Sequence, residues 1–145
     1  MKACCESPVE YRLLEHTADL GIEVRAADLA ELFARAGAAL ADLLYDPAPV
    51  AETLYRVVLL DERDREILLV RWLNELIFLR EVEEFLWKRV EVEIDGAFRL
   101  RAVLLGEAFE ATRHVPRTGL KAATYHMLCI EPGPQNLVAR VLFDV

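Results

Sequence analysis

The sequence predicts an α+β fold, a single domain in which a mostly antiparallel β-sheet packs with two long α-helices. Apolar residues recur at helical spacing in two segments, 29–45 and 65–86. Around them lie alternating or densely apolar segments typical of strands, several joined by hairpin-like turns. The chain has 145 residues, of which 54% are hydrophobic. That length and composition suit one domain, residues 1–145, with its own core.

The first residues, 1–10, are expected to form a loose leader. They contain no apolar segment of a secretory signal, and no apolar run reaches the ~18 residues of a membrane span. A cytoplasmic protein without membrane contact is therefore expected. Cys4, Cys5 and Cys129 give neither a disulfide framework nor a Cys-x-x-Cys pattern. The adjacent pair is interpreted as incidental, with a redox or metal role as the alternative.

The first half of the chain predicts two strands and a helix. Strands are expected at 11–15 and 20–26, the second because apolar and polar residues alternate. The polar segment 16–19 breaks the pattern between them. The helix 29–45 follows, with Asp28 as its N-cap.

The middle of the chain predicts a strand at 53–61 and a second helix at 65–86, with Asp64 as a cap. Apolar residues spread beyond one face of this helix, which indicates that it is largely buried. Asn74 lies among them, and a buried amide needs partners. We expect a structural hydrogen bond to a nearby loop, with a binding role as the alternative.

The segment 88–105 predicts a hairpin. A two-residue turn at Asp95-Gly96 would mix apolar and polar faces. A three-residue loop, 95–97, keeps the faces consistent by pairing Ile94 with Phe98.

The segments 121–131 and 137–145 predict a last hairpin with a five-residue loop. That register sets Tyr125 opposite Phe143 on the core face. It also sets Thr124 opposite Asp144 on the other face, with His126 on the adjacent diagonal.

The charge balance argues against strong direct nucleic-acid binding. The net charge is −8, from 25 acids against 17 lysines and arginines. Nucleic-acid affinity comes mainly from basic side chains on phosphates. A cationic protein partner or a bound metal fits better. The scattered glycines, the single serine and the absence of Gly-x-Ser-x-Gly leave an ordinary kinase or hydrolase poorly supported.

The C-terminus is the first candidate site. Asp144 places its carboxylate beside the main-chain carboxylate of Val145. Two anionic groups this close repel unless a cation or a donor neutralises them, and oxygen ligands suit Ca²⁺, Mg²⁺ or Mn²⁺. A frayed, solvated end is the alternative. The apolar Phe143 and Val145 favour a docked end.

The three histidines and one aspartate give weaker signals. His16 could ligate a metal, act as a base or support a ligand, and Asp19 could be a ligand or cap a turn. A histidine bonded within its strand is the plainer reading of His126. His114, in the loop 106–120, is expected to be solvated.

Four segments, in order and over about residues 11–145, resemble the archease family. They are His16-Thr17-Ala18-Asp19-Leu20-Gly21, residues 69–79 around Arg71-Trp72-Leu73-Asn74-Glu75, Lys121-Ala122-Ala123-Thr124-Tyr125-His126, and Ala139-Arg140-Val141-Leu142-Phe143-Asp144-Val145. The family pattern has valine where this chain has Ala123, a change that touches packing more than chemistry.

The resemblance implies a cofactor of the RtcB-type tRNA-splicing ligase, without enzyme activity of its own. Such proteins promote guanylylation of the ligase's active-site histidine and repeated turnover. The resemblance also implies one divalent metal ion, with calcium expected and magnesium or manganese as alternatives. Its ligands would be Asp19, Asp144 and Val145, with His16 and His126 in supporting or partner-contact roles.

Two other functions remain open from the residues alone. One is a metal-dependent hydrolase that uses Asp19, Asp144 and His16, which would turn over substrate without a partner. The other is a chaperone or adaptor without a metal, in which changes at Asp144 and Val145 would be harmless.

Overall fold

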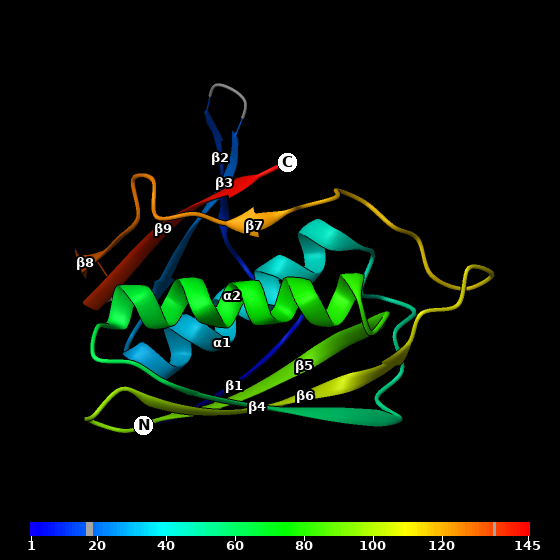
Figure 1. Ribbon diagram of the computed structural model, residues 1–145, viewed down its shortest axis with the longest axis horizontal. Helices are drawn as coiled ribbons and strands as arrows, with labels where there is room; N and C mark the ends of the chain where they lie inside the picture. Colours follow the sequence, from blue (N-terminus) through cyan, green and yellow to red (C-terminus); the bar gives the residue numbers. More distant parts are fainter. Residues whose placement is uncertain (17–18, 135) are drawn as a thin grey trace.

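The computed structural model describes residues 1–16, 19–134 and 136–145. Two α-helices lie between two antiparallel sheets (Figure 1). The helices are α1 (Leu29–Leu44) and α2 (Arg65–Glu81). Sheet A has the order β1 (Lys2–Glu6), β5 (Phe85–Ile94), β6 (Arg99–Ala108) and β4 (Leu54–Asp61). Sheet B has the order β2 (Arg12–His16), β3 (Asp19–Ala26), β9 (Asn136–Asp144) and β7 (Ala122–Ala123), with β8 (Cys129–Gly133) also on β9.

The predicted α+β class is confirmed, but the strands form two sheets and not one. Because α1 lies between the two sheets, it is buried nearly all round. It contacts β1 and β5 on one side and β3 and β9 on the other. Both tryptophans bond to it: Trp72 Nε1 donates to the carbonyl of Phe33 and Trp87 Nε1 to that of Gly37, each at 2.9 Å. A Cβ at Gly37 would lie 3.2 Å from the Trp72 ring. The small residue therefore lets α2 pack closely.

The predicted helix starts are confirmed. Asp28 Oδ1 accepts from the Glu31 amide at 2.9 Å, and Asp64 Oδ1 accepts from the Glu66 amide at 2.7 Å. The predicted end of the second helix at 86 is wrong, because α2 ends at Glu81. Glu84 turns the chain with φ 52°, and the apolar residues after it begin β5.

The expectation of a loose leader at 1–10 is also wrong. Residues 2–6 form β1, which pairs along its whole length with β5. The terminal amine donates to the Ile94 carbonyl at 3.1 Å, and Ser7 Oγ donates to the Ala38 carbonyl at 2.6 Å. Two hydrogen bonds and a strand ladder hold this segment against the core.

The first predicted hairpin forms with a wider loop. Ile94 pairs with Leu100 rather than with Phe98. The Asp95 carboxylate accepts from the amides of Ala97 and Arg99, and Phe98 takes the left-handed conformation, φ 55°. The observed register differs from the predicted one by two residues. Each side chain therefore still points to the face of the sheet that was predicted for it.

The register predicted for the last hairpin is wrong. Gly133 pairs directly with Asn136, which shifts β8 by one residue against the expectation. Ala122, not Thr124, lies opposite Asp144. Between β7 and β8 the chain leaves the sheet, so Tyr125 and Met127 are exposed instead of facing the core. Within the described ranges, neither helix is long and apolar enough to cross a membrane.

Candidate functional site

The outer face of sheet B, turned away from the helices, carries the candidate site. On β3, Ile22 and Val24 belong to the core, so Asp19, Gly21 and Glu23 point to the opposite face. Their strand partners form three rows: an acidic row of Asp19 and Asp144, a middle row of Leu14, Gly21 and Leu142, and an arginine row of Arg12, Glu23 and Arg140.

The acidic row brings together two residues that lie far apart in the sequence. Asp19 and Asp144 are direct partners on β3 and β9. Cα atoms in such antiparallel pairs lie about 4.5–5.5 Å apart, and their side chains share a face. On the outer sides of the row, His16 is the strand partner of Asp19, and Ala122 that of Asp144. The His16 side chain, with Thr17 and Ala18, lies outside the described residues.

The strand that carries Asp144 is docked, not frayed. Phe143 is fully buried, and the Asp144 carbonyl accepts from the Lys121 amide at 2.8 Å. The Leu142 carbonyl accepts from the Thr124 amide at 2.9 Å. Figure 1 shows β9 between β3 and β7. Asp144 and Val145 follow this buried stretch and are themselves exposed.

Asn74 supports the strand beside Asp144. Its Oδ1 accepts from the Ala123 amide at 2.7 Å, and its Nδ2 donates to the Ala123 carbonyl at 3.4 Å. The predicted structural hydrogen bond of Asn74 is confirmed, but its partner is strand β7 and not a loop. Both bonds tie α2 to β7, the neighbour of β9 at the acidic row.

The middle row is closely packed. A Cβ at Gly21 would lie 2.5 Å from Leu142 Cδ2 and 2.8 Å from the Val141 carbonyl oxygen. Gly21 is therefore required by the approach of its neighbours. Beside this row, Met127 joins Leu14 and Leu142 around a pocket of about 240 Å³.

The arginine row surrounds a buried carboxylate. Glu23 is 3% exposed, and its oxygens lie 2.7 Å from Arg140 Nε and 3.1 Å from Arg25 Nη2. Arg12 lies 3.9 Å away. Hydrogen bonds, first from Arg140 and then from Arg25, lower the pKa of Glu23 although burial opposes them. This cluster was not found from the sequence, because its members come from three strands.

His114 is buried, which overturns the expectation of a solvated loop residue. Its Nδ1 accepts from the Glu110 amide at 2.8 Å, so the proton of the neutral ring is on Nε2, 3.0 Å from Glu107 Oε2. Arg113 also pairs with Glu107, and this bond is the main reason that the pKa of Glu107 falls to about 2. The cluster fixes the loop after β6.

His126 does not lie on the predicted diagonal beside Asp144. It sits in the exposed turn after β7, where the chain has left the sheet. The turn follows β7, the short strand that pairs with β9 at the acidic row.

The donors of the acidic row suit a hard divalent cation. Two carboxylates directly opposite each other repel, and a cation between them removes that cost. In the ranges that the structure describes, no cluster of three or more histidine, cysteine, aspartate or glutamate side chains could hold a metal ion. A cation held by the acidic row would need oxygen ligands in addition to the two aspartates.

The comparisons with known proteins agree with one another. The model of the Archease protein family (MTH1598/TM1083) matches residues 11–145. The protein archease of Pyrobaculum calidifontis is 37% identical, with 97% of this chain and 99% of the relative covered. That of Methanosarcina acetivorans is also 37% identical, with 94% and 96% covered.

Two solved structures share the fold. The solution structure of Methanobacterium thermoautotrophicum protein 1598 has a TM-score of 0.78 and 29% identity, with 93% of this chain and 98% of that chain covered. The crystal structure of a Thermotoga maritima archease, described as a possible chaperone, has a TM-score of 0.63 and 22% identity, with 91% and 94% covered. The family match over most of the chain and the identity to full-length relatives lead to one conclusion: this chain belongs to the archease family.

Proposed function

We propose that this chain is a metal-binding protein cofactor of an RtcB-type tRNA-splicing ligase in the cytoplasm, without enzyme activity of its own. It would promote guanylylation of the ligase's active-site histidine and allow many turnovers. The observation that carries the proposal is the direct pairing of Asp19 with Asp144 across β3 and β9. Membership of the archease family, one of whose members is described as a possible chaperone, supports a role through a partner.

The proposed ligands are the carboxylates of Asp19, Asp144 and Val145, and the ion is calcium, with magnesium or manganese as alternatives. A bound divalent cation would supply a fixed positive charge that neutralises the row. The other residues of the site hold its strands in place. Asn74 and the buried Phe143 fix β7 and β9, and the tight Gly21 contact fixes β3 against β9. The two aspartates are thereby held in one orientation before a partner arrives.

The surface around the acidic row fits a protein partner. Tyr125, Met127 and Val145 are more than half exposed close to the row. Apolar side chains beside a negative charge match a partner surface that has apolar contacts and a basic groove. In this proposal docking favours the ligase conformation that is competent for guanylylation.

The decisive test is ligase turnover with tRNA halves, GTP and Mn²⁺, with the ligase in catalytic amount. Asp144→Ala should reduce product from many turnovers to the level without this protein, because it removes half of the acidic row. Glu81→Ala, an exposed acid at the far end of α2, is the matched control and should stimulate fully. Two glycines added after Val145 should also abolish stimulation by moving the terminal carboxylate.

Full stimulation by Asp144→Ala and by the extended chain would rule out the metal mechanism and leave a metal-independent adaptor. Turnover of a substrate by this protein alone, lost in Asp144→Ala, would instead favour the metal-dependent hydrolase.

A further inference from the structure

An apolar surface lies at the β4 edge of sheet A, away from the acidic row on sheet B. Among the described residues β4 has a strand neighbour, β6, on one side only. Seven of the thirteen large apolar residues that are exposed gather on β4 and along α2: Leu54, Tyr55, Val57, Leu59, Ile67, Phe78 and Val82. We call these seven the β4 edge surface. An exposed apolar edge strand is a template for pairing with another chain.

The α2 part of this surface lies beside the β4 part. Arg71 of α2 donates to the Asp61 carbonyl at 3.2 Å and pairs with Glu62 at 3.0 Å, so its face of the helix reaches the β4 edge. Ile67 and Phe78 lie four residues before and seven after Arg71, hence on the same face. Ile67 and Phe78 therefore lie next to the β4 edge. Tyr55, Val57 and Leu59 alternate with the buried Val58 and point to the face of sheet A that is turned away from the helices.

The β4–β6 register shows which backbone amides and carbonyls of β4 point away from β6. The Glu62 amide donates to the Phe98 carbonyl in the β4–β6 register, so even-numbered residues of β4 direct their backbone groups to β6. Tyr55, Val57, Leu59 and Asp61 therefore direct theirs outward. Arg56 donates to the Tyr55 carbonyl at 3.0 Å, and Arg71 covers that of Asp61. The open stretch is Val57–Leu59, centred on Val58.

We propose that this edge binds a second copy of the chain, with β4 antiparallel to β4 and a two-fold axis at Val58. The open stretch is then its own complement: Val57 of each copy pairs with Leu59 of the other, and four backbone hydrogen bonds form. The two four-stranded sheets become one continuous sheet.

The charges on β4 suit this occupant. Arg56 and Glu62 lie near opposite ends of β4 and on the same face, so pairing about Val58 places Arg56 on the diagonal from Glu62 of the second copy. The nearby arginines are balanced within each copy, since Arg56, Arg71, Arg99 and Arg101 pair with Glu83, Glu62, Asp95 and Glu93. The net charge of the whole chain is therefore not concentrated at this surface.

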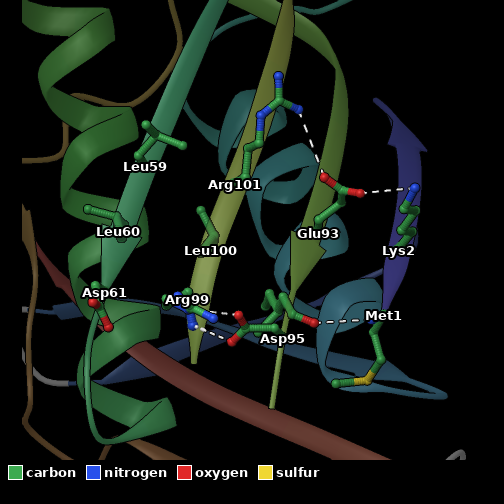
Figure 2. Close-up of a pocket in the computed structure, with 11 residues that line it drawn as sticks. Met1, Lys2, Leu59, Leu60, Asp61, Glu93, Asp95, Arg99, Leu100 and Arg101 are labelled. Atoms are coloured by element: carbon green, nitrogen blue, oxygen red, sulfur yellow. Dashed lines mark hydrogen bonds and ion pairs between the residues drawn. The ribbon is translucent and has the colours of Figure 1, made fainter. Parts of the chain in front are cut away.

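A pocket next to the edge receives a side chain of the second copy. It measures about 550 Å³, and Leu59, Asp61 and Arg99 are among its lining residues. Figure 2 shows that Lys2, Glu93 and Arg101, which also line it, pair with one another across β1, β5 and β6. In the proposed register Tyr55 of the second copy lies opposite Asp61. Its ring covers the pocket wall, and its hydroxyl is in position to donate to the Asp61 carboxylate.

The test measures the mass of the full-length chain by sedimentation over a wide concentration range. The mass should rise from one chain, 16.5 kDa, toward twice that value. Leu59→Arg should weaken the association at least about tenfold, because it sets a charge against Val57 of the second copy. Leu59 is 70% exposed, so the fold should be unaffected. Val115→Arg, at an exposed loop residue, is the matched control and should associate like the parent chain.

Amide hydrogen exchange provides a readout without a substitution. The outward amides of Val57 and Leu59 should exchange more slowly as concentration rises, whereas the Val58 amide, bonded to β6, should be protected throughout. A chain that stays monomeric at every concentration with unchanged exchange would overturn the proposal. So would a dimer that survives Leu59→Arg, since its interface would lie elsewhere. Either result leaves ligase stimulation untouched, so the two proposals fail separately.

Discussion

Two cross-strand pairs on one face of sheet B differ in charge: one joins opposite charges and the other joins like charges. Glu23 lies opposite Arg140, and three arginines approach its buried carboxylate. Four residues along the same strands, Asp19 lies opposite Asp144, a pair of like charges at a more exposed position. Oppositely charged partners stabilise a sheet and like charges destabilise it. The comparison separates a carboxylate that stabilises the fold from a like-charged pair that we propose as a cation site.

The largest effect should come from breaking the arginine row. Arg140→Ala removes the shortest bond to Glu23 and should give the largest fall in the free energy of unfolding, because a buried carboxylate loses its main partner. Urea denaturation measures this. Arg25→Ala, which removes the longer bond, is the control and should cost clearly less. Equal costs for both would mean that Glu23 is held by overall charge and not by the Arg140 contact.

Acid should reveal a second structural carboxylate of the same kind. Bonds from Arg113 and the Ala51 amide lower the pKa of Glu107 from 4.5 to about 2. A depressed pKa in the folded state means stability that is fully present above about pH 4.5 and is lost as the pH falls toward about 2. At 1.36 kcal/mol per pH unit the loss is about 3 kcal/mol. Unfolding free energies measured across this range should flatten in Glu107→Gln.

The acidic row should respond to metal where the arginine row does not. Calcium at about one hundred times its dissociation constant should stabilise the chain by about 2.7 kcal/mol, since only the folded state holds the ligands together. Asp144→Asn should abolish this gain. Without metal it should change stability by no more than about 1 kcal/mol, and upward, because it relieves repulsion. A calcium effect of equal size in Asp144→Asn would place the cation elsewhere.

Local signals in the sequence predicted local structure well. The caps at Asp28 and Asp64 were predicted because a helix start is set by a few neighbouring residues. The end of α2 was missed because Phe85 and Leu86 continue the apolar pattern, while the left-handed turn at Glu84 has no glycine to signal it. The last register failed because Tyr125 and Met127 leave the sheet, and alternation alone gives no sign of such an interruption.

The candidate site could be predicted only in part. Local chemistry pointed to Asp144 and Asp19 separately, and only the family resemblance joined them in one site. Their pairing depends on two strands from opposite ends of the chain. Nothing local in either strand fixes which partner it takes. The buried His114 was also missed. Its partners Glu107 and Glu110 are nearby in sequence, but the loop that buries them is positioned by the core.

The middle row also separates the two charged rows electrostatically. They lie four residues apart along each strand, or about 13 Å. That exceeds the screening length of about 8 Å at physiological ionic strength. The arginines around Glu23 therefore cancel little of the negative potential at the acidic row. Because the apolar middle row lies between them, the arginine row and the acidic row can occupy the same small sheet.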